Sequence, residues 1–139
     1  MFEDWQLALL AAARTATLGT IAADGRPHLV PVCYALVEGT IVIAIDEKPK
    51  RAGTLARLRN LARDPRASVL VQHYAEDWTA LAWVRCEGQA DVLARGDEWP
   101  AALAALRDRY PRYEAMALER LPLVRLPVAR VVSWRWMDG

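Results

Sequence analysis

The chain has 139 residues, of which 54% are hydrophobic and 25% charged, and its formal net charge is +1. We expect a single domain over residues 1–139, and the composition excludes general disorder. A small disulfide scaffold is also excluded, because the chain has only two cysteines. The near-neutral charge disfavours nucleic acid and membrane surfaces as partners. The apolar run Leu7–Ala13 is too short to span a bilayer, and the acidic Glu3 and Asp4 precede it, so we expect a cytoplasmic protein.

Helical spacing of apolar residues predicts a first helix over Asp4–Ala13, after which alternating apolar and polar residues predict strands. The first two strands, Thr15–Ala23 and His28–Leu36, flank Asp24-Gly25, a pair typical of tight hairpin turns. Pro31 lies inside the second strand, which favours a position at a sheet edge or at a bulge.

The rest of the chain mixes short helices with longer strands. We expect a helix over Thr54–Arg63, with Thr54 as its N-cap and Asp64-Pro65 as its end. The other expected elements are strands over Thr40–Ile45, Arg66–Tyr74, Thr79–Ala94 (bent at Gly88) and Val124–Trp136, and helices over Asp97–Arg109 (capped by Asp97) and Tyr113–Glu119. This order lacks a regular βαβ repeat and predicts a small antiparallel barrel with helices at its rim.

Several patterns of catalytic and metal-binding residues are missing. The two histidines, His28 and His73, exclude a histidine-rich metal site, and Cys33 and Cys86 do not form a CxxC pair. The cysteines fit small core residues, and the histidines fit ordinary strand positions, with a haem ligand or a proton donor as the alternative. No nucleophile elbow, P-loop or GxGxxG sequence occurs, so an enzyme of this sequence needs a cofactor.

Positive charge is concentrated between Asp46 and Arg66. The basic residues of this segment are Lys48, Lys50, Arg51, Arg57, Arg59, Arg63 and Arg66, opposed by Asp46, Glu47 and Asp64. A cationic loop that leads into a helix N-terminus favours an anion site, and a solvated helix face is the simpler alternative. The six tryptophans are explained most simply by core packing, but flat rings near an anion site also suit a planar heterocycle or a single-stranded nucleic acid.

Three stretches resemble the flavin-binding split-barrel superfamily that includes pyridoxamine 5'-phosphate oxidase, and more narrowly its coenzyme F420-dependent oxidoreductases. They are ATLGTIAADGRPHLVPVCYAL (16–36), IDEKPKRAGTLARLRNLARDPRASVLV (45–71) and DWTALAWVRCEGQADVL (77–93). The resemblance implies a mainly β (α+β) fold, a six-stranded antiparallel split β-barrel with flanking helices. It also implies a homodimer with two cofactor sites in the grooves between subunits.

The same resemblance assigns roles to particular residues. Cofactor phosphate contacts are implied for Lys48, Lys50, Arg57 and Asn60. Contacts along the cofactor ring are implied for Pro31, Val32 and Cys33. Positions near the groove, partly from the other subunit, are implied for Trp78, Trp83 and Arg85. The C-terminal SWRWMDG lacks the Arg and His substrate residues of pyridoxamine 5'-phosphate oxidase, which disfavours vitamin B6 oxidation.

We therefore expect a hydride-transferring oxidoreductase that uses coenzyme F420, a deazaflavin, on a small organic substrate. The first alternative keeps the fold and uses FMN. The second is a flavin carrier or haem-binding protein without turnover, with His28 or His73 as haem ligand. A nucleic-acid binder that uses the same arginines and tryptophans is a third alternative, disfavoured by the net charge.

Overall fold

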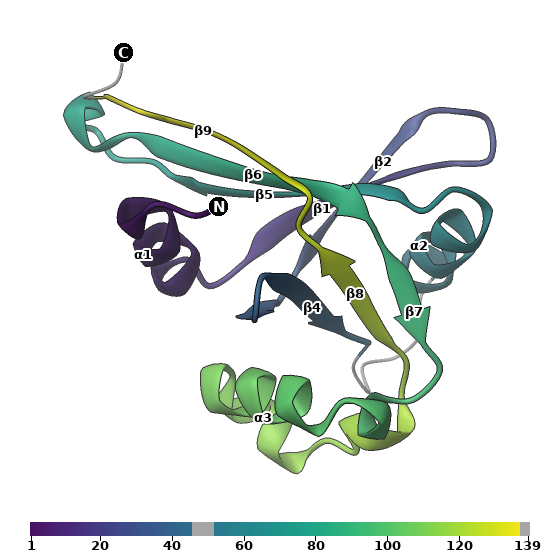
Figure 1. Ribbon diagram of the computed structural model, residues 1–139. Helices are drawn as coiled ribbons and strands as arrows, with labels where there is room; N and C mark the ends of the chain where they lie inside the picture. The colour runs from purple at the N-terminus through teal and green to yellow at the C-terminus, as the bar shows by residue number, and fades with distance from the viewer. Residues whose placement is uncertain (46–51, 137–139) are drawn as a thin grey trace.

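The computed structural model describes residues 1–45 and 52–136 (Figure 1). The helices are α1 (Asp4–Ala12), α2 (Ala52–Arg63) and α3 (Pro100–Arg109). The strands of the described chain are β1 (Ala16–Ile21), β2 (Pro27–Val32), β3 (Ala35–Val37), β4 (Thr40–Ala44), β5 (Arg66–His73), β6 (Ala82–Gln89), β7 (Asp91–Leu93), β8 (Leu123–Pro127) and β9 (Arg130–Arg135). Short 3-10 segments are η1 (Trp78–Ala80), η2 (Gly96–Glu98), η3 (Pro111–Ala115) and η4 (Leu118–Arg120).

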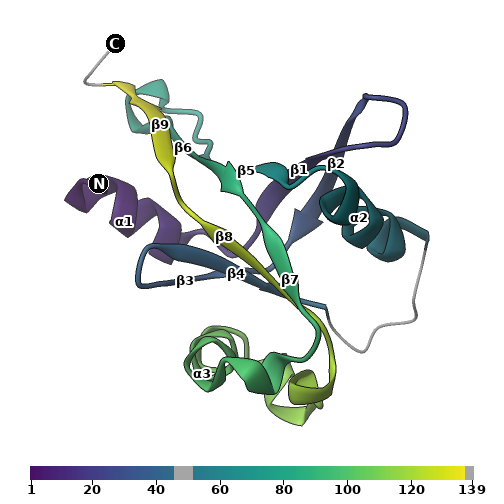
Figure 2. The ribbon, with the colours of Figure 1, turned by 45° about the vertical axis from the view of Figure 1, so that its right-hand side comes forward.

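The strands form two antiparallel sheets. The five-stranded sheet has the order β2-β1-β5-β6-β9, and the four-stranded sheet has the order β3-β4-β8-β7. Figure 1 shows the first sheet nearly edge on, with the second sheet and all three helices on one side of it, and Figure 2 shows the same arrangement turned. The antiparallel split barrel with flanking helices is confirmed, and β2 is an edge strand, as Pro31 predicts.

Three of the six expected strands bend and contribute to both sheets, so the described chain has more strands than expected. The bends lie at Cys33–Tyr34, at Ala90 and at Val128–Ala129. The backbone groups that leave the ladders there find other partners: Tyr34 exchanges two hydrogen bonds with the Tyr110 hydroxyl, and Ala90 N–H donates to Pro65 O. The bend expected at Gly88 lies two residues later. Gly88 serves packing instead, because a Cβ there would lie 2.5 Å from Pro127 O.

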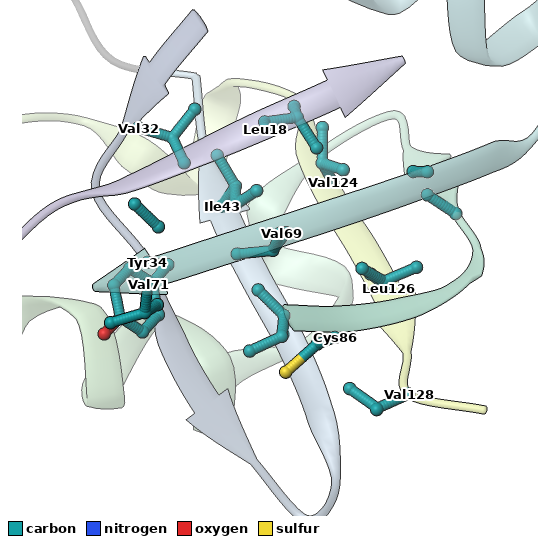
Figure 3. Packing of buried hydrophobic residues seen from close by; sticks show 14 of the residues in the cluster. Leu18, Val32, Tyr34, Ile43, Val69, Val71, Cys86, Val124, Leu126 and Val128 are labelled. Carbon is teal, nitrogen blue, oxygen red and sulfur yellow. The ribbon is translucent and has the colours of Figure 1, made fainter. Parts of the chain in front are cut away.

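Two hydrophobic clusters form the core. The larger lies between the sheets and under α1 and α2, and Figure 3 shows part of it around Leu18, Val69 and Cys86. The smaller cluster joins α3 to the four-stranded sheet through Leu103 and Leu106. The larger cluster follows from strand alternation, because Ala67, Val69 and Val71 of β5 are buried and Ser68 and Leu70 between them are half-exposed.

The helices differ from the expected ones at their ends. α2 begins at Ala52, so Thr54 lies inside its first turn instead of capping it. Asp97 belongs to η2, and α3 begins at Pro100, a residue well suited to the first helical turn. The segment Tyr113–Glu119 forms two short 3-10 turns instead of a helix, and Arg107 holds it by donating to Tyr113 O and Met116 O.

No helix within residues 1–45 and 52–136 is long and apolar enough to cross a membrane.

Candidate functional site

Part of the expected anion site is a buried polar cluster between α2 and β1. Asn60 is 4% exposed and Thr20 is 3% exposed, and Asn60 Nδ2 donates to Thr20 Oγ1 at 3.1 Å. Arg63 Nη1 donates to Asn60 Oδ1 at 3.4 Å and to Ile21 O at 3.5 Å. Asn60 therefore fixes α2 against the sheet, and its amide oxygen orients the Arg63 guanidinium. Thr20 was not expected in the site; its only sequence signal is a polar residue at an inward strand position.

Other polar groups border this cluster. His28 lies directly across from Thr20 in the β1–β2 register and on the same strand face as Val30 and Val32. Its Nδ1 is buried and has no hydrogen-bond partner in the described structure. On α2, Arg57 is half-buried and Arg59 is exposed. From Arg57 to Arg63 the helix rises by about 9 Å, so its cations are spread along one axis.

Asp64, the acidic residue that follows α2, is paired with Arg66. Asp64 forms two hydrogen bonds with the Arg66 guanidinium, at 3.0 and 2.7 Å, and these hold the pKa of Asp64 down at about 2. Asp64 is thus engaged mainly by Arg66, which follows α2 in the chain. Lys48 and Lys50, the other expected phosphate contacts, lie outside the described residues.

The three residues expected along the cofactor ring are divided by the pleat of β2 and the following bend. Pro31 is exposed and faces away from the core, Val32 is 5% exposed within the core, and Cys33 is half-buried against the smaller cluster. Val32 can therefore face a bound ring only through its backbone. Because β2 is an edge strand, one of its edges keeps backbone groups outside the ladder.

The expected aromatic residues lie at the far end of the five-stranded sheet. Trp83 and Arg85 share the outer face of β6, where the Arg85 guanidinium lies 5.5 Å from the centre of the Trp83 ring. Arg85 also pairs with Glu87 at 2.7 Å. Trp78 is 60% exposed in η1, beyond the end of β5.

A single chain does not bring the polar cluster beside α2 and the expected tryptophans together. α2 ends just before β5 begins at Arg66, whereas Trp78 follows the opposite end of that strand at His73. Eight residues of extended strand span roughly 23 Å, so the α2 cluster and the tryptophan end cannot line one small-molecule site within a single copy.

The remaining reactive side chains are poorly placed for chemistry. Cys86 is fully buried, and burial raises the pKa of its thiol to about 11, so it behaves as a core residue. His73 is exposed at the end of β5, away from α2. Within the described chain, no three of the metal-ligating His, Cys, Asp and Glu side chains gather.

Comparisons with known proteins agree with this fold. The family model described as pyridoxamine 5'-phosphate oxidase matches residues 2–135. A conserved hypothetical protein, Rv2991 from Mycobacterium tuberculosis, is 28% identical with a TM-score of 0.73, over 98% of this chain and 86% of that one. A heme binding protein from Mycobacterium smegmatis is 27% identical with a TM-score of 0.68, over 93% and 55% of the two chains. An FAD-binding protein from Mesorhizobium loti, 21% identical with a TM-score of 0.69 over 96% and 94%, shares the fold.

Proposed function

Because the chain belongs to the pyridoxamine 5'-phosphate oxidase family, we propose that it is a coenzyme F420-dependent oxidoreductase acting on a small organic substrate. The observation that carries the cofactor choice is the spacing of Arg57 and Arg63 along α2. These two arginines lie about 9 Å apart along the helix axis, which suits an extended anion such as a phosphodiester with an acidic tail. A single terminal phosphate, as in FMN, needs only a compact pocket.

The residues present fit such a cofactor. The buried Nδ1 of His28 has no hydrogen-bond partner in the described structure, and it adjoins the Thr20–Asn60 pair, so a polar ligand atom at this end of the barrel would satisfy it. Arg57 and Arg63 would bind the anionic chain, and Lys48 and Lys50 would add to them from the preceding segment. Asn60 would act by positioning Arg63.

The chemistry divides between cofactor and protein. When bound, a deazaflavin supplies the hydride transfer, and the protein needs no nucleophile. The backbone of β2 around Val32 would orient the ring, with Pro31 and Cys33 beside it. Trp83 and Arg85 would form the substrate wall, and Trp78 would extend it. Since the tryptophans lie far from α2 in one copy, the proposal includes a homodimer whose two copies share each site.

The test begins with protein purified from a host that lacks the deazaflavin. We expect it to be nearly colourless and to bind added F420 more tightly than FMN, with binding weakened by salt. Arg57→Ala should weaken F420 binding, whereas Arg112→Ala, an exposed arginine on the α3 side, should not. A yellow protein that keeps one FMN per chain through purification would overturn the F420 assignment in favour of the FMN alternative.

A carrier without turnover is the second candidate, and the 27% identical heme binding protein favours testing it. Haem binding would require His28 or His73. Titration with haem, compared between wild type, His28→Ala and His73→Ala, would identify the ligand. A Soret shift abolished by one substitution, together with no F420 or FMN binding, would replace the oxidoreductase proposal.

A further inference from the structure

β3 is the outermost strand of the four-stranded sheet, and within the described chain it pairs on one side only, with β4. Its other edge lies between two helices, α1 and α3 (Figure 2). Leu36 packs against the larger hydrophobic cluster, which includes Leu10 of α1, whereas Ala35 belongs to the smaller cluster with α3. The edge of β3 is therefore the floor of a groove whose two walls are helices.

This groove has a volume of about 490 Å³. Its α1 wall is apolar and consists of Leu7, Leu10 and Ala11, of which Leu7 is 40% exposed. Its α3 wall carries the small Ala105 and the exposed Asp108. The alanines on both walls leave room for a main chain to approach the strand edge.

The β3–β4 hairpin fixes which backbone groups face the groove. Val37 and Thr40 flank a two-residue turn, Glu38-Gly39, in which both residues have positive φ, so these two strand residues exchange hydrogen bonds. Such pairs alternate along an antiparallel ladder, so the N–H and C=O of the preceding Leu36 point away from β4. Outside the ladder, no hydrogen bond of the described chain reaches either group.

Tyr34 shows what the edge groups of this strand require. It lies two residues before Leu36, and its N–H and C=O therefore face the same edge. The Tyr110 hydroxyl satisfies both, at 3.1 and 3.0 Å, and so takes the place of a neighbouring strand there. A partner for Leu36 must likewise offer one acceptor and one donor side by side, which an extended main chain does.

A cation stands at the end of the groove that Tyr110 closes. The Arg14 guanidinium lies 4.9 Å from the centre of the Tyr110 ring and donates to Arg109 O, so its position is fixed. Arg14 is exposed, and no carboxylate of the described residues pairs with it. Arg109, the other cation of the groove, is already engaged by three carbonyl groups at the end of α1. Arg14 is therefore the group that can receive a carboxylate.

We propose that this groove binds an extended peptide with a free terminal carboxylate, the C-terminal segment of a partner protein. The peptide adds to β3 as an antiparallel strand, exchanges two hydrogen bonds with Leu36 and directs its carboxylate to Arg14. The direction follows from the cation, which stands at the Tyr34 end of β3. Three strand residues are about 10 Å long, so the edge accommodates about three residues of peptide.

The walls predict which side chains the peptide carries. The residue opposite Leu36 is the penultimate one, and its side chain lies on the same face as that of Leu36, toward the apolar α1 wall. Its two neighbours point toward α3, where Ala105 and Asp108 favour small hydroxyl side chains. The preferred C-terminus is therefore an apolar penultimate residue between serines or threonines.

The probe is a fluorescein-labelled pentapeptide with valine as its penultimate residue, serine and threonine elsewhere, and a free carboxylate. Its binding to the full chain is followed by fluorescence anisotropy. Amidation of the C-terminus should weaken binding roughly tenfold, the value of one charge-assisted hydrogen bond. N-methylation of the valine, which removes its N–H, and replacement of the valine by aspartate should each abolish binding. An N-methylated peptide that binds as well as the parent overturns strand addition.

Ala11→Leu tests the groove itself, because it narrows the groove from an exposed helix position without touching the core. It should weaken peptide binding at least tenfold. Ala8→Leu adds the same bulk at an exposed position of α1 outside the groove and should leave the affinity unchanged. Circular dichroism and thermal melts show that both variants fold. An Ala11→Leu protein that binds the peptide as tightly as wild type overturns the site.

Arg14→Gln tests the carboxylate contact, since glutamine keeps a donor and loses the charge. This variant should bind the free and the amidated peptide equally, whereas wild type should prefer the free one; a preference that persists overturns the role of Arg14. Two results with wild type overturn the proposal as a whole. One is no binding at millimolar peptide. The other is self-association that Ala11→Leu abolishes and Ala8→Leu does not, which would assign the groove to a second copy of the chain.

Discussion

Replacing Thr20 by valine removes the acceptor that holds Asn60 and therefore tests what fixes α2 against the sheet. Both side chains are almost fully buried and their hydrogen bond measures 3.1 Å. Valine keeps the branched shape that a strand favours, so the change is close to a pure loss of the hydroxyl. The Asn60 Nδ2 group is then left without its partner.

The size of the effect follows from two opposing terms. Leaving a buried donor unsatisfied lowers the free energy of unfolding by about 1–3 kcal/mol, and burying the added methyl group raises it by somewhat under 0.8 kcal/mol. We expect Thr20→Val to lower the free energy of unfolding by about 1–2 kcal/mol. For a chain of this size each kcal/mol corresponds to roughly 4 °C in Tm.

The assay is urea unfolding followed by circular dichroism, with Thr40→Val as the matched control at a half-buried strand position. Cofactor affinity should fall less in Thr20→Val than in Arg57→Ala, since Thr20 acts through Asn60. The double variant Thr20→Val with Asn60→Ala should cost little more than Asn60→Ala alone. A Thr20→Val protein as stable as wild type, or strictly additive costs, would show that this bond does not hold α2.

Three further predictions concern charge and titration. Arg57→Ala should weaken F420 binding ten- to a hundredfold, as measured by fluorescence titration. This corresponds to about 1.5–3 kcal/mol for the loss of a direct charge-assisted contact. An unchanged affinity would show that the anion site does not include Arg57. Arg109→Lys should lower the free energy of unfolding by about 2–3 kcal/mol, because lysine cannot make all the contacts of the guanidinium. Arg109 donates to Leu10 O, Ala11 O and Ala13 O at the end of α1 and lies 4.8 Å from the Tyr34 ring centre. A free energy of unfolding equal to that of wild type in denaturant would contradict this prediction. Burial raises the pKa of Tyr34 to about 12 and that of Cys86 to about 11, so the folded state retains these protons longer than the unfolded state and stability should fall as the pH rises from about 9 to 12. Tyr34→Phe should reduce the upper part of that decline in unfolding titrations, and a decline unchanged in the variant would assign it to other groups.

The strands were largely predictable because burial of one face leaves a period of two in the sequence. β5 was expected over Arg66–Tyr74 and is found over Arg66–His73. The hairpin at Asp24-Gly25 was equally predictable from the sequence, because Gly25 adopts a φ of 86°, a conformation that favours glycine. Pro31 marked an edge strand because it has no N–H to donate to a second neighbour.

The bends at which strands pass from one sheet to the other could not be predicted from the sequence, because they depend on hydrogen-bond partners far away in the chain. Tyr34 leaves one sheet for the other where the Tyr110 hydroxyl, 76 residues later, satisfies its backbone. The same limit applies to the site. Composition located the cations of α2, but only packing shows that Asn60 is bound to Thr20 and that Trp83 faces outward at the opposite end of the sheet. Periodicity records which positions are buried; which element covers them is decided by non-local contacts that leave no local pattern.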